Sequence, residues 1–365
     1  MPNGDIAELA RNNNNPRQGN CLMNEIMREK IVNPAAWLGP EIAMDTSWYY
    51  HLDDKAIGEL DAALKSVKAA GLTNPFPKSD FPLPTFAGEL EEIARRVEDG
   101  VGFVMVRGLP RERYSDEDCE LIYWGIGVHL GRPVSQNTKG HLLGHVRDEG
   151  KSLSDPNARA YQTSAKLDFH SDQLPVDLLG LLCMRTAMKG GASYLVSALT
   201  VHNVLLDERP DVLETLYQPF NLDWRGENPE GEKPWYSCPM FSYHDGKVTS
   251  RITSRAFFES VSRWGEELAM NDKQRDALDV VQEISGRSEL RLAMDFKEGD
   301  MQFVNNHTVL HARESYEDYP EKERRRHLLR MWISAPEDKR RKLSPLLADR
   351  YRFVEMGGVP KKVVA

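Results

Sequence analysis

The chain has 365 residues, of which 40% are hydrophobic and 28% charged, and its formal net charge at pH 7 is −9. This acidic balance argues against nucleic acid as a partner, and no apolar run approaches the roughly 18 residues of a membrane helix, so we expect no membrane partner. The four cysteines, at positions 21, 119, 183 and 238, show no C-x-x-C spacing and indicate free thiols in a reducing, cytoplasmic compartment.

The first hundred residues predict a tail and a helical extension. Residues 1–20 are polar and rich in asparagine and lack the apolar segment of a secretory signal, so we expect a disordered tail. Residues 21–99 are expected to form an N-terminal helical extension. Its clearest element is an amphipathic helix over 52–70, in which apolar residues recur at helical spacing: Ile57, Leu60, Leu64 and Val67. A second helix is expected at 90–97.

We expect the main domain to cover residues 100–365. It opens with a strand at 100–108 and a helix at 115–129, for which Ser115 is a candidate N-cap. The stretch 131–148 is rich in glycine and polar residues, which is typical of a functional loop. It contains Gln136 and Asn137, which we interpret as candidate substrate contacts or as turn-stabilising residues.

The stretch Leu167-Asp168-Phe169-His170-Ser171-Asp172 places a histidine and an aspartate two residues apart at the end of a predicted strand. Side chains two apart on a strand share a face, so His170 and Asp172 project together. They supply two ligands of the 2-His-1-carboxylate set that binds non-haem Fe(II) and leaves positions open. Tyr161 leads into this strand and is a candidate substrate contact. Lys166, at an even offset from His170, contacts a substrate carboxylate or is a surface lysine.

The chain then predicts a buried strand, a hairpin and two helices. Residues 178–184 form a nearly continuous apolar run, as expected of a strand buried on both faces. Helices are expected at 201–216 and 272–284, with an Asp-Gly hairpin at 241–248 between them. Arg251 lies on the second arm of that hairpin. It either points into the interior as a candidate substrate contact or is solvated.

Two stretches near the C-terminus complete the pattern. Glu298-Gly299-Asp300 opens an apolar run that leads to His307 and His311, and by spacing alone either histidine could be the third metal ligand. Fifteen residues after His311, an apolar strand begins with Arg326 and carries Arg330 on the same face. Iron(II) oxygenases of this kind need a dianionic co-substrate, and arginine binds a carboxylate through two parallel hydrogen bonds better than lysine does.

Taken together and in this order, the motifs resemble the taurine/2-oxoglutarate dioxygenase family, whose relatives include γ-butyrobetaine and clavaminate-type oxygenases. The resemblance extends from about Gly100 to Ile333. It rests on G-x-G-F-V-x-x-R-G (100–108), F-H-S-D (169–172), G-G-A-S (190–193), E-G-D (298–300), N-N-x-x-x-L-H-A-R (305–313) and R-H-L-L-R-x-W (326–332).

The resemblance implies a set of ligands. His170, Asp172 and His311 would bind Fe(II), and the L-H-A-R motif favours His311 over His307. Ser193 and Arg326 would bind 2-oxoglutarate, and Arg330 would line the same pocket. Many relatives have threonine at the position of Ser193, and the serine retains the hydroxyl.

The resemblance also implies a fold and a reaction. The fold is α+β, a double-stranded β-helix (jelly-roll, cupin-like) barrel braced by external helices. The reaction uses dioxygen to convert 2-oxoglutarate to succinate and carbon dioxide while oxidising, usually hydroxylating, an unactivated C–H bond of a small-molecule substrate. Desaturation, demethylation and ring formation are alternatives within the same chemistry.

Two other classes of protein remain open. A cupin-type metal protein could use zinc or nickel for hydrolysis or isomerisation, but Arg326 and Ser193 would then have no role. A ligand-binding protein on an inactive oxygenase fold is the second alternative, although the expected ligands are all present. The identity of the substrate and the formation of a homo-oligomer stay open.

Overall fold

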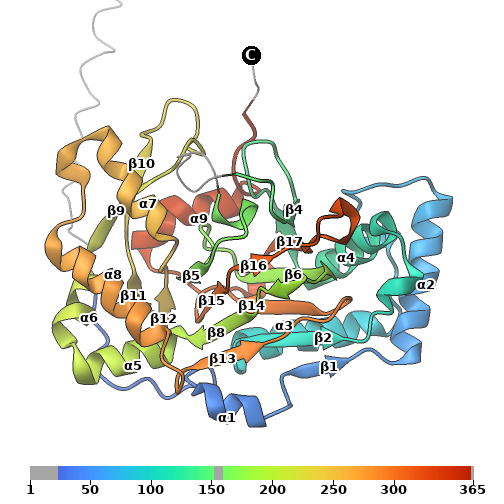
Figure 1. Cartoon of the computed structure of the whole chain (residues 1–365), viewed down its shortest axis with the longest axis horizontal. Helices are drawn as coiled ribbons and strands as arrows, with labels where there is room; N and C mark the ends of the chain where they lie inside the picture. The colour runs from blue at the N-terminus through green and yellow to red at the C-terminus, as the bar shows by residue number, and fades with distance from the viewer. Residues whose placement is uncertain (1–23, 152–158, 363–365) are drawn as a thin grey trace, which may run out of the picture.

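The computed structural model describes residues 24–151 and 159–362, so the tail expected at residues 1–20 lies outside the described residues. The fold is α+β, as the sequence predicts, with two main β-sheets at the centre and helices around them (Figure 1). In the described part of the chain, no helix is long and apolar enough to cross a membrane.

The larger sheet has seven strands, in the order β1-β2-β14-β6-β17-β3, and β4 also pairs with β17. All pairs are antiparallel except β1 with β2. The segment 131–148, expected to be a loop, therefore contributes two short strands. The strands are β1 (Tyr49–His51), β2 (Phe103–Arg107), β3 (Arg132–Val134), β4 (Leu143–Val146), β6 (Leu178–Arg185), β14 (Met301–Asn305) and β17 (His327–Ser334).

The central strands of this sheet are buried on both faces. On β6, Leu178 and Leu182 pack towards three helices, whereas Leu179 belongs to the core shared with the smaller sheet. Because side chains alternate along a strand, both sets of positions must be apolar. This explains the continuous apolar run at 178–184 and confirms that it is a strand buried on both sides.

Three helices cover one face of the larger sheet: α2 (Asp54–Ala69), α3 (Phe86–Asp99) and α4 (Asp116–Leu130). The side chain of Asp53 caps α2, and Ser115 forms a capping box with Asp118 at the start of α4, as the Ser115 prediction requires. The N-terminal extension is thus mainly helical, but it also supplies β1 to the sheet. The division of the chain at residue 100 stays a prediction.

The smaller sheet has four antiparallel strands, in the order β13-β8-β15-β5. Its strands are β5 (Leu167–His170), β8 (Ser193–Ser197), β13 (Arg291–Met294) and β15 (Val309–Arg313). The helices that pack beside this sheet are α1 (Gly39–Met44), α5 (Ala198–Glu208), α6 (Pro210–Leu216) and α8 (Asp272–Ser285). Asn271 caps α8 and forms a capping box with Gln274.

Three two-stranded ribbons and two short helices complete the fold. The predicted Asp-Gly hairpin joins β11 to β12, and its turn residues Asp245 and Gly246 have φ values of 49° and 75°, as such a turn requires. The elements are β7 (Lys189–Gly190) with β16 (Tyr316–Glu317), β9 (Pro219–Asp223) with β10 (Trp235–Pro239), β11 (Phe241–His244) with β12 (Lys247–Ser250), α7 (Arg255–Glu259) and α9 (Ala348–Glu355).

The close packing of β6 on α4 yields a test of the fold. A Cβ at Gly180 would lie 2.4 Å from the Tyr123 hydroxyl, so Gly180→Ala should lower the free energy of unfolding by about 1–3 kcal/mol. A matched change, Gly58→Ala in α2, meets nothing within 4 Å and should raise it by about 0.4–1 kcal/mol. Urea unfolding measures both, and equal stability of the two variants would contradict the packing described.

Candidate active site

A cavity of about 380 Å³ lies between the two sheets. The smaller sheet contributes His170, Ser193 and His311 to its wall, and the larger sheet contributes Arg330 and Trp332. The cavity therefore receives most of the residues that the sequence motifs singled out.

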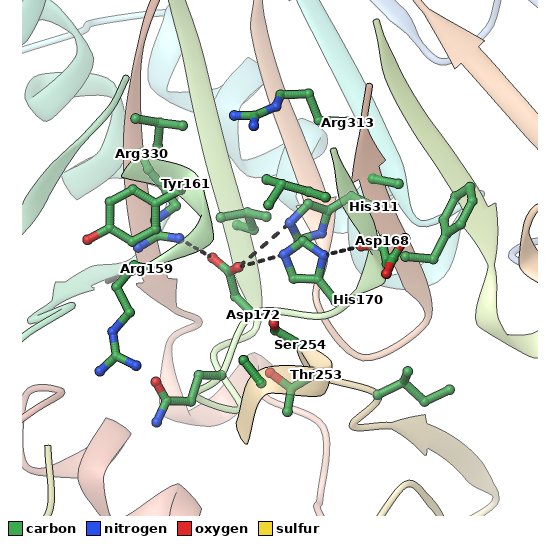
Figure 2. A pocket seen from close by; sticks show the side chains of 18 of the residues that line it. Arg159, Tyr161, Asp168, His170, Asp172, Thr253, Ser254, His311, Arg313 and Arg330 are labelled. Carbon is green, nitrogen blue, oxygen red and sulfur yellow. Dashed lines mark hydrogen bonds and ion pairs between the residues drawn. The ribbon is translucent and has the colours of Figure 1, made fainter. Parts of the chain in front are cut away.

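Strand pairing brings the expected metal ligands together. His311 on β15 lies directly opposite His170 on β5, and the two ring centroids are 4.2 Å apart. Asp172 follows two residues after His170, and its Oδ1 lies 3.9 Å from His170 Nε2 and 3.6 Å from His311 Nε2 (Figure 2). Within the described residues, this is the one group of three or more His, Cys, Asp or Glu side chains that could hold a metal.

Hydrogen bonds orient two of the three side chains for metal binding. The ring of His170 contacts the Asp168 carbonyl through Nδ1 at 2.7 Å, so Nδ1 carries the proton and the Nε2 lone pair remains for a metal. The Oδ2 atom of Asp172 accepts from Trp332 Nε1 and lies 3.3 Å from Arg330 Nη1. This leaves Oδ1, on the side of the histidines, as the ligand atom.

The electrostatics of the group match a set of deprotonated ligands. Burial alone would raise the pKa of Asp172, but the Arg330 guanidinium and the two imidazoles hold it below its ordinary value. Burial, and then the neighbouring His170, lowers the pKa of His311 to about 3, so this ring is neutral at physiological pH. A carboxylate and a neutral imidazole are the forms that bind a metal ion.

The loop after β5 is held by two side chains from distant segments. Asn306 accepts from the Asp172 backbone N–H at 2.7 Å and donates to the Leu174 carbonyl at 2.9 Å. Arg251 donates through Nη2 to the Asp172 carbonyl at 2.5 Å and to the Gln173 carbonyl at 2.8 Å. The two residues fix the backbone that carries the carboxylate ligand.

The structure corrects the expected role of Arg251. This side chain is 5% exposed and is absent from the cavity wall, so it is not placed to contact a substrate. The physical reason is that the irregular loop after β5 has carbonyls that no sheet partner satisfies, and the buried guanidinium supplies the missing donors. Of the two interpretations made from the hairpin pattern, the interior orientation is the one observed, but the side chain binds the loop backbone and does not line the cavity.

The turn between β14 and β15 separates the two downstream histidines. His307 lies in that turn, is fully buried, and its Nε2 lies 3.1 Å from Asp177 Oδ1. The turn interrupts the strand alternation on which the spacing argument depended, so His307 and His311 do not share a face. His311 is the one that lies in the cavity.

Two buried arginines mark one end of the cavity. Arg326 and Arg313 each keep Nη1 without a hydrogen-bond partner among the described residues, and neither forms an ion pair with a described carboxylate. Arg313 lies opposite Ser193 on the neighbouring strand, and both guanidiniums lie over the Tyr316 ring, at 5.1 Å and 4.7 Å. Two cations facing a cavity without a counter-ion suit a bound carboxylate.

The Gly-Gly pair before Ser193 permits this close packing. Gly190 and Gly191 have φ values of 74° and 76°, which other residues rarely adopt. A Cβ on Gly191 would also approach Arg326 Nε to 3.4 Å. Arg313, the last residue of the N-N-x-x-x-L-H-A-R motif, is not among the predicted site residues, although strand alternation places it on the same face as His311.

The remaining predicted residues divide between the cavity wall and other positions. Arg330 donates through Nε to Gln136 Oε1 at 2.7 Å and lies 4.7 Å from the Tyr161 ring, so these three residues form one cluster in the wall. Lys166 lines the rim, where its exposed side chain pairs with Asp168 at 3.0 Å. Asn137 lies outside the wall and accepts from the Lys139 N–H, as a turn-stabilising residue does.

Comparison with known proteins agrees with this geometry. Residues 68–332 match the family described as "Taurine catabolism dioxygenase TauD, TfdA family". FR-33289 synthase of Streptomyces rubellomurinus is 32% identical over 317 residues, which cover 86% of this chain and 92% of that protein. The taurine hydroxylase-like protein SAT17 of Stachybotrys chartarum is 30% identical over 313 residues, covering 83% and 79%.

Solved structures share the fold at low sequence identity. Asparagine oxygenase, in a complex with Fe(II), 3-hydroxyasparagine and succinate, aligns with a TM-score of 0.60 at 15% identity, over 79% of this chain and 93% of that one. The non-heme iron oxygenase OrfP, in a complex with Fe and alpha-ketoglutaric acid, aligns with a TM-score of 0.54 at 15% identity, over 82% and 98%.

The geometry predicts which histidine binds metal. Removing one of three ligands leaves a weak two-point site, so His311→Ala should lower metal affinity by more than about a hundredfold. Equilibrium binding of Fe(II) under argon measures this. His307→Ala is the control: it should retain the metal while losing about 1–3 kcal/mol of stability, because Asp177 loses a buried partner. The reverse pattern would show that the wrong histidine was assigned.

The hydrogen bonds from Arg251 to the loop after β5 predict that this residue affects metal binding without contacting the metal. Arg251→Met removes donors from two backbone carbonyls and should lower Fe(II) affinity by about ten- to a hundredfold, as is typical for partners that orient a ligand. Arg251→Lys should recover part of the loss. The surface variant Arg287→Met, which breaks ion pairs with Glu208 and Glu283, should leave metal affinity unchanged. A loss of stability with unaltered metal affinity would reduce Arg251 to a structural residue.

Proposed function

The chain belongs to the TauD/TfdA family of dioxygenases, and from this premise we propose that it hydroxylates an unactivated C–H bond of a small molecule. It is an oxidoreductase of the Fe(II)- and 2-oxoglutarate-dependent class. The proposal adds to that assignment the residues that perform each task and the outcome at the substrate carbon.

The observation that carries the proposal is the pairing of two features in one cavity. A 2-His-1-carboxylate group lies beside two buried arginines that have no carboxylate partner among the described residues. The first feature suits Fe(II) with open coordination positions, and the second suits a dicarboxylate. A zinc or nickel cupin would use the first feature and leave Arg313 and Arg326 without a purpose. A protein with an inactive site would need neither the metal-binding group nor the two arginines.

The residues divide the work as follows. His170, Asp172 and His311 would hold Fe(II), which supplies dioxygen activation coupled to oxidative decarboxylation of 2-oxoglutarate. Arg326, with Ser193 opposite Arg313, would hold the far carboxylate of 2-oxoglutarate. Arg330 keeps Asp172 ionised and points its Oδ2 away from the metal position.

Apolar side chains from both sheets exclude bulk water from this space. The cavity wall between the charged groups is built from Leu179, Leu181, Leu195 and Leu328. In a dry cavity, the charge-assisted contacts that hold the co-substrate are stronger than they are in water. Exclusion of water also confines the oxidation to the bound substrate.

We also propose that the two main sheets form a double-stranded β-helix. Along the chain, β5 lies in the smaller sheet, β6 in the larger, β8 and β13 in the smaller, β14 in the larger, β15 in the smaller and β17 in the larger, so the chain alternates at every step except from β8 to β13. This is the chain path of a jelly roll. A cytoplasmic location belongs to the same proposal and is supported by the free, buried thiols of Cys119, Cys183 and Cys238.

The proposed activity is tested without knowledge of the substrate. Enzymes that decarboxylate 2-oxoglutarate release succinate, so the purified chain should form succinate at a slow basal rate that requires Fe(II), 2-oxoglutarate and dioxygen together. Addition of the true substrate should raise that rate and yield a product heavier by one oxygen atom. Absence of succinate with all three present would contradict the assignment, and a product lighter by two hydrogens would replace hydroxylation with desaturation.

The position of Arg326 predicts a specific defect in co-substrate binding. Hydrogen bonds to charged groups contribute roughly 1.5–3 kcal/mol each, so Arg326→Ala should weaken 2-oxoglutarate binding by about ten- to a hundredfold and leave Fe(II) bound. Arg326→Lys should recover only part of the affinity, because an ammonium lacks the planar fork. Ser193→Ala should have a smaller effect, because it removes one neutral donor.

Arg330→Ala is the matched comparison for that experiment. Arg330 contacts Asp172 rather than the far end of the cavity, so its removal should weaken the metal more than the co-substrate. Calorimetric titration of 2-oxoglutarate under argon measures all four variants. If Arg330→Ala weakens 2-oxoglutarate and Arg326→Ala leaves it untouched, the two arginines exchange roles.

A further inference from the structure

One part of the cavity wall has no role in binding iron or 2-oxoglutarate. Figure 2 shows Arg313 on one side of the metal-ligand group and Arg159, Thr253 and Ser254 on the other. Arg225, Glu227 and Phe257 also line this second side. It is the side away from the proposed co-substrate end, where a substrate could reach the metal centre without displacing 2-oxoglutarate.

Arg159 is held in place but incompletely satisfied. Its Nη2 pairs with Glu227 Oε1 at 2.6 Å and donates to the Arg225 carbonyl at 3.3 Å. Its Nη1 is buried and has no hydrogen-bond partner among the described residues. A buried guanidinium N–H without an acceptor is costly, so an acceptor supplied by a ligand would complete the arrangement. Glu227 Oε2 is also buried without a hydrogen-bond partner among the described residues. A ligand that carries a donor group close to its anion could donate a hydrogen bond to this oxygen.

A second guanidinium lies close to the first. The Cζ atoms of Arg159 and Arg225 lie 5.3 Å and 5.6 Å from the centroid of the same ring, that of Phe257. Burial, and then the charge of Arg159, lowers the pKa of Arg225. Two like charges over one ring repel each other, and the carboxylates of Asp223 and Glu227 offset part of that repulsion.

The charge of the whole cavity points the same way. Seven arginines and lysines line it against four carboxylates, although the chain as a whole carries a net charge of −9. Fe(II) and 2-oxoglutarate bring equal and opposite charges, so the positive excess persists when both are bound. A cleft of one sign of charge in a protein of the other sign concentrates ligands of complementary charge.

We propose that the substrate carries an oxyanion group, which Arg159 binds on the side of the metal centre opposite the co-substrate. Glu227 orients Arg159, and the Phe257 ring contacts its guanidinium. This assignment rests on the proposed function, because it names the substrate class of the same enzyme. Carboxylate, phosphonate and sulfonate groups share the required chemistry, and the experiment separates them.

The test uses short probes of matched size. Propionate, ethylphosphonate, ethanesulfonate and the neutral propionamide are titrated by calorimetry into the full chain loaded with Fe(II) and saturating 2-oxoglutarate under argon, so that the co-substrate end is filled. At least one anion should bind about tenfold or more tightly than propionamide. Arg159→Met should weaken that anion by about ten- to a hundredfold, and Arg159→Lys should recover part of the loss.

Arg255→Met is the matched control from the same wall. Arg255 already pairs with Glu259 at 2.8 Å and with Asp279, so its removal should change anion affinity by less than about threefold. Two results overturn the assignment: anions that bind no better than propionamide, or an Arg255→Met variant that loses as much affinity as Arg159→Met. The second result would mean that the general field of the cavity, not a built subsite, attracts the anion.

Basal succinate formation by the same preparations distinguishes a wrong substrate assignment from a wrong proposed function. If succinate forms but no anion binds, the substrate assignment is wrong and the proposed function stands. If no succinate forms with Fe(II), 2-oxoglutarate and dioxygen present, the proposed function is wrong and the substrate assignment fails with it. Retained 2-oxoglutarate binding by Arg159→Met shows that the variant is folded, and Arg159→Lys replaces it if it is not.

Discussion

The register of β15 is the constraint on which the site depends. This strand pairs with β5 on one side, where His311 faces His170, and with β8 on the other, where Arg313 faces Ser193. His311 and Arg313 are two residues apart and therefore project from the same face. A slip of one residue would turn both side chains out of the cavity. One strand thus sets the positions of the metal group and of the carboxylate-binding end together.

Arginine serves this protein in three physically different ways. Arg330 acts through its charge on Asp172. Arg251 acts through its N–H groups on backbone carbonyls. Arg350 acts through aromatic contacts as well as a hydrogen bond. It donates to the Gln173 carbonyl at 2.8 Å, and its guanidinium lies 4.1 Å from the ring centroids of Trp224 and Tyr236. Lysine could replace none of them fully, since it lacks the planar fork.

The sequence predicts best what depends on local pattern. The Ser115 cap, the doubly buried strand at 178–184 and the Asp-Gly turn all follow from short-range rules. The order of the motifs, through the family resemblance, singled out His170, Asp172 and His311, and these three side chains lie together in the structure. Residues that act across the fold were harder: Arg251 binds a loop about 80 positions earlier in the chain, and no local pattern encodes that contact. His307 shows a different limit of sequence patterns. Its spacing from His311 would place both on one face of a continuous strand, but His307 lies in a turn, where side chains do not alternate in that way.

The parallel pairing of β1 with β2 covers one edge of the larger sheet. A chain that began at Gly100 would leave the outer edge of β2 unpaired and would uncover the face of the larger sheet that α2 and α3 bury. Open edges beside apolar surface are sites of intermolecular strand addition. The N-terminal extension is therefore not a dispensable decoration. Loss of this segment would expose both the edge of β2 and the apolar face beside it to strand addition by other copies of the chain.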